Sequence, residues 1–248
     1  MEHCLPAPAL IDARALDLDQ ALQLLQQAGA LLPDEAPLSA AWLQAVLDAL
    51  CDLSSRDALT GLANRRSFEM ALAREVDRVA RSGEAALLLM LDIDHFKAVN
   101  DTHGHGAGDQ VICAVARVIE QAVRPMDLVA RVGGEEFGII LPSCAPHVGL
   151  AVAERVRERI AELAIDIGAG QRLGVTASLG GAFAPQWVRS SPLLWTERAD
   201  RQLYRAKAEG RDRACLEPQV DSLVSAEEKG MLFATLNPSD TPTQQDLP

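Results

Sequence analysis

Apolar residues between positions 55 and 217 follow two patterns along the chain. Stripes at three- and four-residue steps predict helices over 65–82, 110–123, 147–163 and 193–208. Short apolar runs predict strands over 85–91, 128–132, 137–141, 173–183 and 213–217. The first of these runs is unbroken for seven residues and ends at Asp92, which is typical of a strand buried on both faces.

Gly133 and Gly134 separate two of the predicted strands. Because both glycines can adopt positive φ angles, the pair predicts a β-hairpin with a tight turn. Strands separated by helices, together with one hairpin, predict the α/β class in the form of an α+β sandwich. We therefore expect a mixed central sheet with flanking helices.

Residues 1–54 predict an N-terminal helical extension. One helix is expected over 9–28, ending at Gly29, and a second begins after Ser39, a favourable N-cap residue. The second helix carries an apolar stripe formed by Leu43, Val46, Leu47, Leu50 and Leu53. Two interpretations stay open, because a coiled coil needs three or more heptads. The stripe packs on the adjoining domain, or it forms a short helical dimer contact.

The net charge of −12 is carried by the two ends of the chain. Residues 1–54 hold eight acidic residues and one arginine, and residues 216–248 hold six acidic residues and one lysine. The segment between them is balanced, with 21 basic and 21 acidic residues. A nucleic-acid polymer is therefore not an expected partner, because proteins that bind one present a basic face or tail. The composition of 218–248 predicts an acidic, largely disordered tail, most clearly at 236–248.

Membrane insertion and export are also not expected. A membrane-spanning helix needs about 20 apolar residues, whereas the longest apolar run here has seven. The first residues are acidic, which is the wrong charge for a secretory signal. Five scattered cysteines without C-x-x-C or metal-ligand spacing indicate reduced thiols. We expect a cytoplasmic protein without a membrane span.

Three acidic residues follow predicted strands or the hairpin turn. Asp92 ends the buried run, at the edge of the sheet where α/β proteins bind ligands. Glu135 and Glu136 follow the hairpin glycines, and one of them faces Asp92 if the hairpin pairs beside the first strand. Crowded carboxylates repel unless a cation lies between them, and oxygen ligands favour a hard ion such as Mg²⁺ or Mn²⁺. The alternative is that these are solvated acids flanking strands.

Lysine is rare in this chain, with three residues against 20 arginines. Lys97 follows the Asp92 strand, and Lys207 lies four residues before Arg211. An ammonium group suits a terminal phosphate, which favours an anionic ligand near the predicted metal site. The alternative is that Lys207 and Arg211 lie at the exposed end of a helix, where cations interact favourably with the dipole.

Six sequence blocks, in order and with their spacing, carry a resemblance. They are DALTGLANRRSF at 57–68, DIDHFKAVND at 92–101, GHGAGD at 104–109, GGEEF at 133–137, SLGG at 178–181 and ADRQLYRAKAEGR at 199–211. Together they resemble the GGDEF family of diguanylate cyclases, here in a GGEEF variant, over about 55–217. The resemblance implies a fold similar to the palm of nucleotide polymerases and class III nucleotidyl cyclases. It also implies that two GTP molecules are joined into cyclic di-GMP, with release of two pyrophosphates.

The resemblance assigns a role to each candidate residue near the strand and the hairpin. Asp92, the Ile93 carbonyl, Glu135 and Glu136 match the positions that hold two Mg²⁺ (or Mn²⁺) ions, and the three acids are the implied catalytic residues. The implied contacts to the β- and γ-phosphates of GTP are Phe96, Lys97, Lys207 and Arg211. Asn100 and Asp109 match the guanine-binding pair, and a carboxylate can accept from guanine N1–H and N2–H₂, donors that adenine lacks in that arrangement.

A second motif, Arg-x-x-Asp at Arg124–Asp127, matches the family's product-inhibition site. Arg155 matches the partner arginine that a facing domain supplies. One GTP per domain leaves the reaction half assembled, so the resemblance implies a homodimer, which the 1–54 helices are placed to bring together. For Arg124 and Asp127 a surface salt bridge is the alternative. For the whole chain the alternatives are a catalytically silent cyclic di-GMP receptor and a scaffolding module.

Overall fold

The computed structural model describes residues 16–30, 36–168, 170–184 and 190–218. The helices are α1 (Asp19–Gln27), α2 (Ala40–Ser55), α3 (Arg65–Ser82), α4 (Phe96–His103), α5 (His105–Ala122), α6 (Pro146–Ala161) and α7 (Pro192–Ala208). The strands are β1 (Leu87–Ile93), β2 (Leu128–Arg131), β3 (Glu136–Leu141), β4 (Ile165–Asp166), β5 (Arg172–Leu173), β6 (Ala177–Phe183) and β7 (Ala214–Leu216).

The central sheet has five strands in the order β2-β3-β1-β6-β7. Strand β1 is antiparallel to both of its neighbours, and β7 is parallel to β6, so the sheet is mixed. In this register Asp92 lies opposite Glu136 of β3 and Ser178 of β6. The predicted α+β sandwich with a mixed sheet is confirmed.

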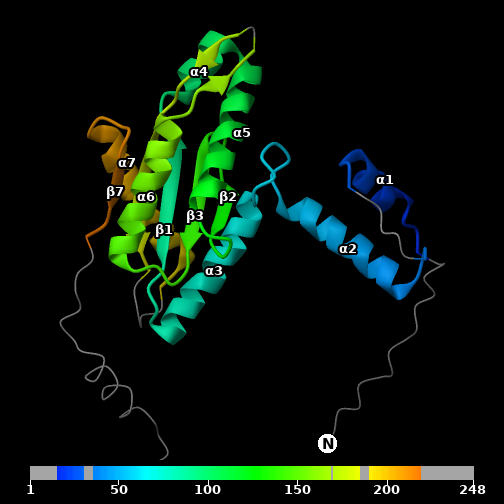
Figure 1. Ribbon diagram of the computed structural model, residues 1–248. Coiled ribbons are helices and arrows are strands. Elements are labelled where there is room, and N and C mark those ends of the chain that lie inside the picture. The colour runs from blue at the N-terminus through cyan, green and yellow to red at the C-terminus, as the bar shows by residue number, and fades with distance from the viewer. Residues whose placement is uncertain (1–15, 31–35, 169, 185–189, 219–248) are drawn as a thin grey trace, which may run out of the picture. The chain divides into compact units, whose positions relative to one another are not determined.

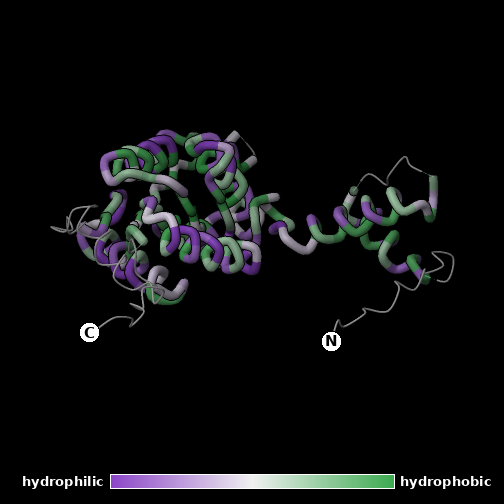
Figure 2. The backbone as a smooth tube through the Cα atoms, turned by 90° about the horizontal axis from the view of Figure 1, so that it is seen from below, coloured by the Kyte–Doolittle hydropathy of each residue, from purple (hydrophilic) through white to green (hydrophobic). Residues whose placement is uncertain are grey.

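Helices cover both faces of this sheet (Figure 1). Leu87, Leu89 and Leu91 of β1 belong to the core cluster that includes α5 and α6 residues, whereas Leu88 and Met90 belong to the cluster with α3 and α7. All seven residues of β1 are buried, as the unbroken apolar run predicts. Figure 2 shows apolar and polar residues alternating along the surrounding helices, which turn their apolar stripes inward.

Helix α4 and the start of α5 are absent from the sequence prediction. The prediction begins a helix at 110, but α5 begins at His105. Helix α4 ends at His103, and Gly104, with a φ of 82°, separates the two helices. The predicted strand over 173–183 is also wrong in part. Only its first residue, Leu173, belongs to β5, which pairs with β4 in a separate two-stranded sheet, and the central strand β6 begins at Ala177. Short elements of this kind give too few apolar positions to show a period.

The hairpin between β2 and β3 is present, but its turn differs from the predicted one. The connection is the four residues 132–135, and neither Gly133 nor Gly134 has a positive φ. A four-residue connection does not need the left-handed conformations of a two-residue turn. A Cβ at Gly133 would lie 2.4 Å from Glu136 Oε2, so a larger residue there would require the Glu136 side chain to move.

Helices α1 and α2 contact each other through an apolar cluster of their own, centred on Leu25, Trp42 and Val46. The Ser39 side chain caps α2 by accepting from the Trp42 amide, as predicted. Part of the predicted stripe therefore packs on α1, while Leu47 and Leu53 are exposed. The N-terminal part of the helix predicted over 9–28, and the predicted tail beyond Pro218, lie outside the described residues. Within the described ranges, no helix is both long and apolar enough to cross a membrane.

Candidate active site at the end of strand β1

Asp92 is the last acidic residue of β1 and is 7% exposed. Its Oδ2 atom lies 2.8 Å from Nζ of Lys207, which comes from the last turn of α7. A buried carboxylate is costly unless it is paired, and this ion pair supplies the partner. The Lys207 side chain thus points to the end of β1. The alternative, in which Lys207 only lines the exposed end of a helix, does not agree with this ion pair.

Glu135 and Glu136 bring two further carboxylates to the same strand end. The backbone amide of Ile93 donates to the Glu135 carbonyl at 3.3 Å, which joins the hairpin turn to β1. Burial raises the pKa of Glu135 above its ordinary value, and the charges of Asp92 and Glu136 raise it further. Lys207 acts in the opposite direction. The three acids therefore lie close together, as predicted. The charge of Lys207 offsets only part of their mutual repulsion.

Arg131 and Asp57 hold the hairpin turn in place. The Arg131 guanidinium donates twice to the Gly134 carbonyl, at 3.1 and 2.8 Å, and its Nη1 lies 3.2 Å from Asp57 Oδ1. Asp57 also accepts from the Thr60 amide and hydroxyl, and these bonds together with Arg131 keep its pKa below the ordinary value. Asp57 lies in the first of the six sequence blocks, but its pairing with Arg131 leaves no local sequence pattern because the two residues are 74 positions apart.

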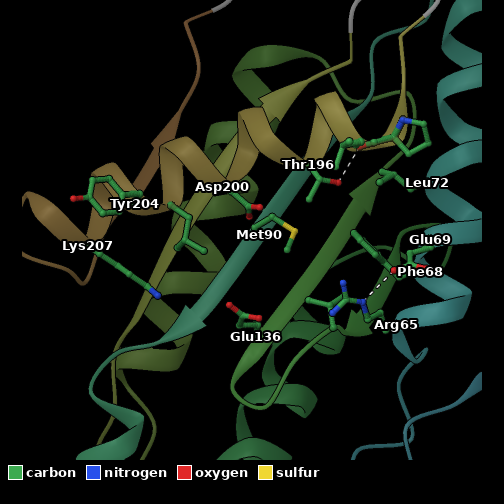
Figure 3. Close-up of a pocket in the computed structure, with 14 residues that line it drawn as sticks. Arg65, Phe68, Glu69, Leu72, Met90, Glu136, Thr196, Asp200, Tyr204 and Lys207 are labelled. Atoms are coloured by element: carbon green, nitrogen blue, oxygen red, sulfur yellow. Dashed lines mark hydrogen bonds and ion pairs between the residues drawn. The ribbon is translucent and has the colours of Figure 1, made fainter.

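A cavity of 520 Å³ opens beside these acids, between α3, α7 and the sheet (Figure 3). Met90 and Leu72 form part of its apolar wall, and Glu136, Asp200 and Lys207 line its polar side. Burial raises the pKa of Asp200, and the charge of Glu136 adds to the effect. The space thus shares Glu136 and Lys207 with the end of β1.

The predicted guanine-binding residues lie on neighbouring helices. Asn100 is on α4 and Asp109 on α5, and the two helices approach so closely that a Cβ on Gly108 would lie 2.0 Å from Asn100 Oδ1. Asn100 Oδ1 is buried and accepts no hydrogen bond from any described residue. A buried acceptor without a donor is unfavourable, so this atom is suited to a donor group on a ligand.

The remaining predicted phosphate contacts are Phe96, Lys97 and Arg211. Phe96 is buried at the start of α4 and Lys97 beside it is exposed. Arg211 lies four residues beyond Lys207, in the loop that connects α7 to β7, with a φ of 63°.

The Arg-x-x-Asp motif forms a closed turn immediately before β2. The Arg124 amide donates to Asp127 Oδ2 at 2.8 Å, and the Asp127 amide donates to the Arg124 carbonyl at 3.0 Å. No side-chain ion pair joins these two residues, both of which are described, so the salt-bridge alternative does not hold. Burial raises the pKa of Asp127, while the Arg124 amide and the charges of Arg124 and Arg155 partly oppose the increase.

Two features place Arg124 and Arg155 differently. Arg124 and Asp127 line a cavity of 620 Å³ together with Arg56 and Arg74. Arg155 instead donates through Nε and Nη2 to the carbonyl of Ala122, on the other side of the turn. Within one chain, both arginines are therefore near enough to Asp127 for their charges to oppose the increase in its pKa.

A metal site is not preformed in the part of the chain that the structure describes. No three His, Cys, Asp or Glu side chains there are grouped as they would be around a metal ion. The donor chemistry nevertheless fits a hard cation, because Asp92, Glu135 and Glu136 offer only oxygen atoms and their negative charges repel one another. The metal-ligand roles of these residues stay predictions.

The family model described as "Diguanylate cyclase, GGDEF domain" matches residues 54–213. The chain therefore belongs to the GGDEF family. Diguanylate cyclase DgcP of Pseudomonas aeruginosa is 43% identical over 157 residues, which are 63% of this chain and 23% of that protein. Diguanylate cyclase A of Treponema denticola is 37% identical over 170 residues, 67% of this chain and 45% of that protein. The chain thus spans less than half the length of these curated relatives.

Solved structures agree with this assignment. The GGDEF domain of DgcB from Caulobacter crescentus, in complex with c-di-GMP, has a TM-score of 0.63 and 39% identity, covering 66% of this chain and 93% of that one. A structure of the coiled coil and GGDEF domain of the same protein has a TM-score of 0.68 and 32% identity, covering 81% of this chain and all of that one.

The raised pKa of Glu135 predicts a pH-dependent loss of stability. Because the folded protein binds this proton more tightly than the unfolded chain does, ionisation of Glu135 destabilises the fold as the pH rises above the ordinary value of 4.5. Glu135→Gln, which does not ionise, is expected to be more stable than the wild type at pH 7 and to lose this advantage near pH 4. Urea denaturation between these pH values measures the difference.

The control is Asp77→Asn, which removes an exposed carboxylate within α3. It is expected to show no such pH-dependent gain. A Glu135→Gln advantage that is the same at both pH values would contradict the prediction.

Proposed function

We propose that this chain is a diguanylate cyclase, which condenses two GTP molecules into cyclic di-GMP and releases two pyrophosphates. The observation that carries the proposal is the 2.8 Å contact between Lys207 Nζ and Asp92 Oδ2, at a strand end where Glu135 and Glu136 also gather. Membership of the GGDEF family supports it. On this proposal the catalytic domain is 55–217, the segment 1–54 is a helical dimerisation or regulatory region, and 218–248 is an acidic tail.

Divalent cations are part of the proposed reaction. Asp92, the Ile93 carbonyl, Glu135 and Glu136 would hold Mg²⁺ or Mn²⁺, two ions per site, and their mutual repulsion favours such a cation. When bound, the metal supplies Lewis-acid stabilisation of the transferring phosphate and lowers the pKa of the attacking ribose 3′-hydroxyl. Lys207 has a second role, because its ammonium group partly neutralises Asp92 until a cation and phosphates replace it.

GTP is the proposed substrate because two groups of residues divide its recognition. Lys97, Lys207 and Arg211, with the backbone of Phe96, would hold the β- and γ-phosphates, and Asn100 with Asp109 would hold guanine. The unpartnered Asn100 Oδ1 supports the second assignment, since a guanine amino group supplies the missing donor. Adenine would leave these acceptors unpaired, so discrimination against ATP is expected to be strong.

A catalytically silent cyclic di-GMP receptor is the competing function. It would use Arg124, Asp127 and Arg155 alone and would not require the ion pair between Lys207 and Asp92 or the crowded acids beside it. A scaffolding module would require neither group. The intact arrangement at the end of β1 therefore favours the cyclase.

The first test measures turnover of GTP in the presence of Mg²⁺, with the product identified by chromatography. Asp92→Asn preserves the size of the side chain and removes its charge, so we expect formation of cyclic di-GMP to fall by about 100-fold or more. The control Asp77→Asn replaces an exposed acid on α3 and should retain wild-type turnover. Equal rates in the wild type and Asp92→Asn would exclude the proposed role, and absence of the product in both would favour the receptor.

A homodimer is part of the proposed reaction because one domain binds one of the two GTP molecules. Turnover per subunit is therefore expected to fall when the enzyme is diluted, as dimers dissociate. Deletion of 1–54 should shift this fall to higher protein concentration if those helices bring the domains together. Initial rates over a dilution series measure both effects, and a rate per subunit independent of concentration would contradict them.

Product inhibition is proposed at the turn formed by Arg124–Asp127. Arg124 can donate to guanine O6 and N7 or to a phosphate, and Asp127 can accept from guanine N1–H. Removing such a charged contact commonly weakens binding by about tenfold or more, so Arg124→Ala should relieve inhibition by added cyclic di-GMP to that extent. Calorimetric titration with product and initial rates measure it, and Arg117→Ala, at an exposed site on α5, is the control. Wild-type protein that releases no heat with product would exclude the site.

A further inference from the structure

Asp94 lies two residues beyond Asp92 and is also buried, at 5% exposure. The sequence places it between predicted metal ligands and phosphate contacts, and no function has been assigned to it above. Its carboxylate accepts three hydrogen bonds from neighbouring groups. Oδ1 accepts from the Ser178 hydroxyl at 2.7 Å, and Oδ2 accepts from the Thr176 hydroxyl at 2.7 Å and the Asp212 amide at 3.0 Å.

The third of these donors comes from the loop that carries Arg211. Gly210, Arg211 and Asp212 all have positive φ angles, of 119°, 63° and 44°. Two of the three are not glycine, so this backbone is unfavourable unless contacts outside the loop stabilise it. The Asp94 carboxylate is one such contact, and the ion pair of Asp212 Oδ1 with Arg157 Nη1 at 3.0 Å is another.

The same loop follows Lys207 directly. The Arg211 amide donates to the Ala206 carbonyl, so the backbone turns back on the end of α7 at the point where Lys207 reaches Asp92. Asp94 therefore connects the end of β1 to the segment that carries Lys207 and Arg211. The connection runs through a charged hydrogen bond to a backbone amide, which is stronger and more directional than a neutral one.

We propose that Asp94 is a positioning residue that holds the 210–212 loop against β1 and thereby sets Arg211 and Lys207 to receive the phosphates of the nucleotide. The proposed role requires no metal ion at Asp94, because it is exerted through the hydrogen bond to the Asp212 amide. The inference rests on the proposed function, since it assumes that a nucleotide triphosphate binds here.

The experiment compares binding of two ligands by calorimetry in the presence of Mg²⁺. One is a GTP analogue with a methylene bridge between the α- and β-phosphates, and the other is guanosine, which has no phosphate. In Asp94→Asn an amide N–H₂ replaces one acceptor oxygen, so the loop contact is weakened. We expect binding of the analogue to weaken tenfold or more, while guanosine binding stays within twofold of the wild type. The Mg²⁺ concentration for half-maximal turnover should not change, in contrast to a variant that loses a metal ligand.

Two further variants separate positioning from a general structural role. Because Asp94 acts through the loop, adding Asp94→Asn to Arg211→Ala should weaken analogue binding by less than twofold beyond Arg211→Ala alone. Ser178→Ala removes the donor to the other carboxylate oxygen. It should lower the melting temperature but retain the wild-type ratio of analogue to guanosine affinity.

Several results would overturn the proposal. One is an equal loss of affinity for the analogue and for guanosine in Asp94→Asn. Another is a loss of analogue affinity in the double variant equal to the sum of the losses in Asp94→Asn and Arg211→Ala. The third is a change in the Mg²⁺ concentration for half-maximal turnover. If Asp94→Asn does not fold, hydrogen exchange of the wild type decides, since an unprotected Asp212 amide overturns the proposal and slow exchange supports it. Wild-type protein that binds the analogue but makes no cyclic di-GMP refutes the proposed function while leaving the role of Asp94 measurable. Wild-type protein that binds no analogue refutes both.

Discussion

The burial of strand β1 on both faces is the constraint on which the rest of the site depends. A strand in this position is stable because its leucines fill two core clusters, but Asp92 near its end and Asp94 just beyond it are buried as well. A buried carboxylate requires compensation by cations or hydrogen-bond donors. The compensating groups come from three separate elements: Lys207 from α7, Ser178 from β6 and the Asp212 amide from the loop beyond α7. The two carboxylates at the end of β1 thereby connect α7, β6 and the loop beyond α7.

The two carboxylates are compensated to different degrees, and this difference corresponds to their proposed roles. Asp94 accepts three hydrogen bonds, from two hydroxyl groups and a backbone amide. Asp92 has one cationic partner, while Glu135 and Glu136 add negative charge nearby. Functional sites commonly retain such unfavourable electrostatics, because a bound ligand then relieves them. The incompletely compensated acid is the one expected to bind a cation, and the fully compensated acid serves the structure around it.

Sequence patterns predicted the parts of the fold that have a long, regular period. Strand β1 and helices α3, α6 and α7 are examples, because each has enough apolar positions to show its spacing. Asp92 and one of the two hairpin glutamates could be predicted to meet, because a charged residue at the end of a buried apolar run is conspicuous, and Glu136 is the one opposite Asp92. The bonds from Asp94 to Ser178 and from Arg131 to Asp57 could not be predicted, since they join residues 84 and 74 positions apart and leave no local pattern. Gly133 was correctly placed in a turn, but the positive φ predicted for it is wrong. A larger residue there would instead displace the Glu136 side chain.

Strand β2 sets a physical limit on how product could act on the proposed active site. Its four residues separate the turn of Arg124–Asp127 from the hairpin turn that carries Glu135, which is a span of about 13 Å at 3.3 Å per residue. The turn proposed to bind product and the turn that carries Glu135 therefore lie at opposite ends of β2. The strand between the turns is also firmly held, since all four residues pair with β3 and Arg131 is anchored to both Asp57 and Gly134. A rigid connection of this kind is poorly suited to transmit a local shift. The inhibition that we propose would then act by restricting how two domains approach each other, because the proposed reaction requires two domains with one substrate bound to each.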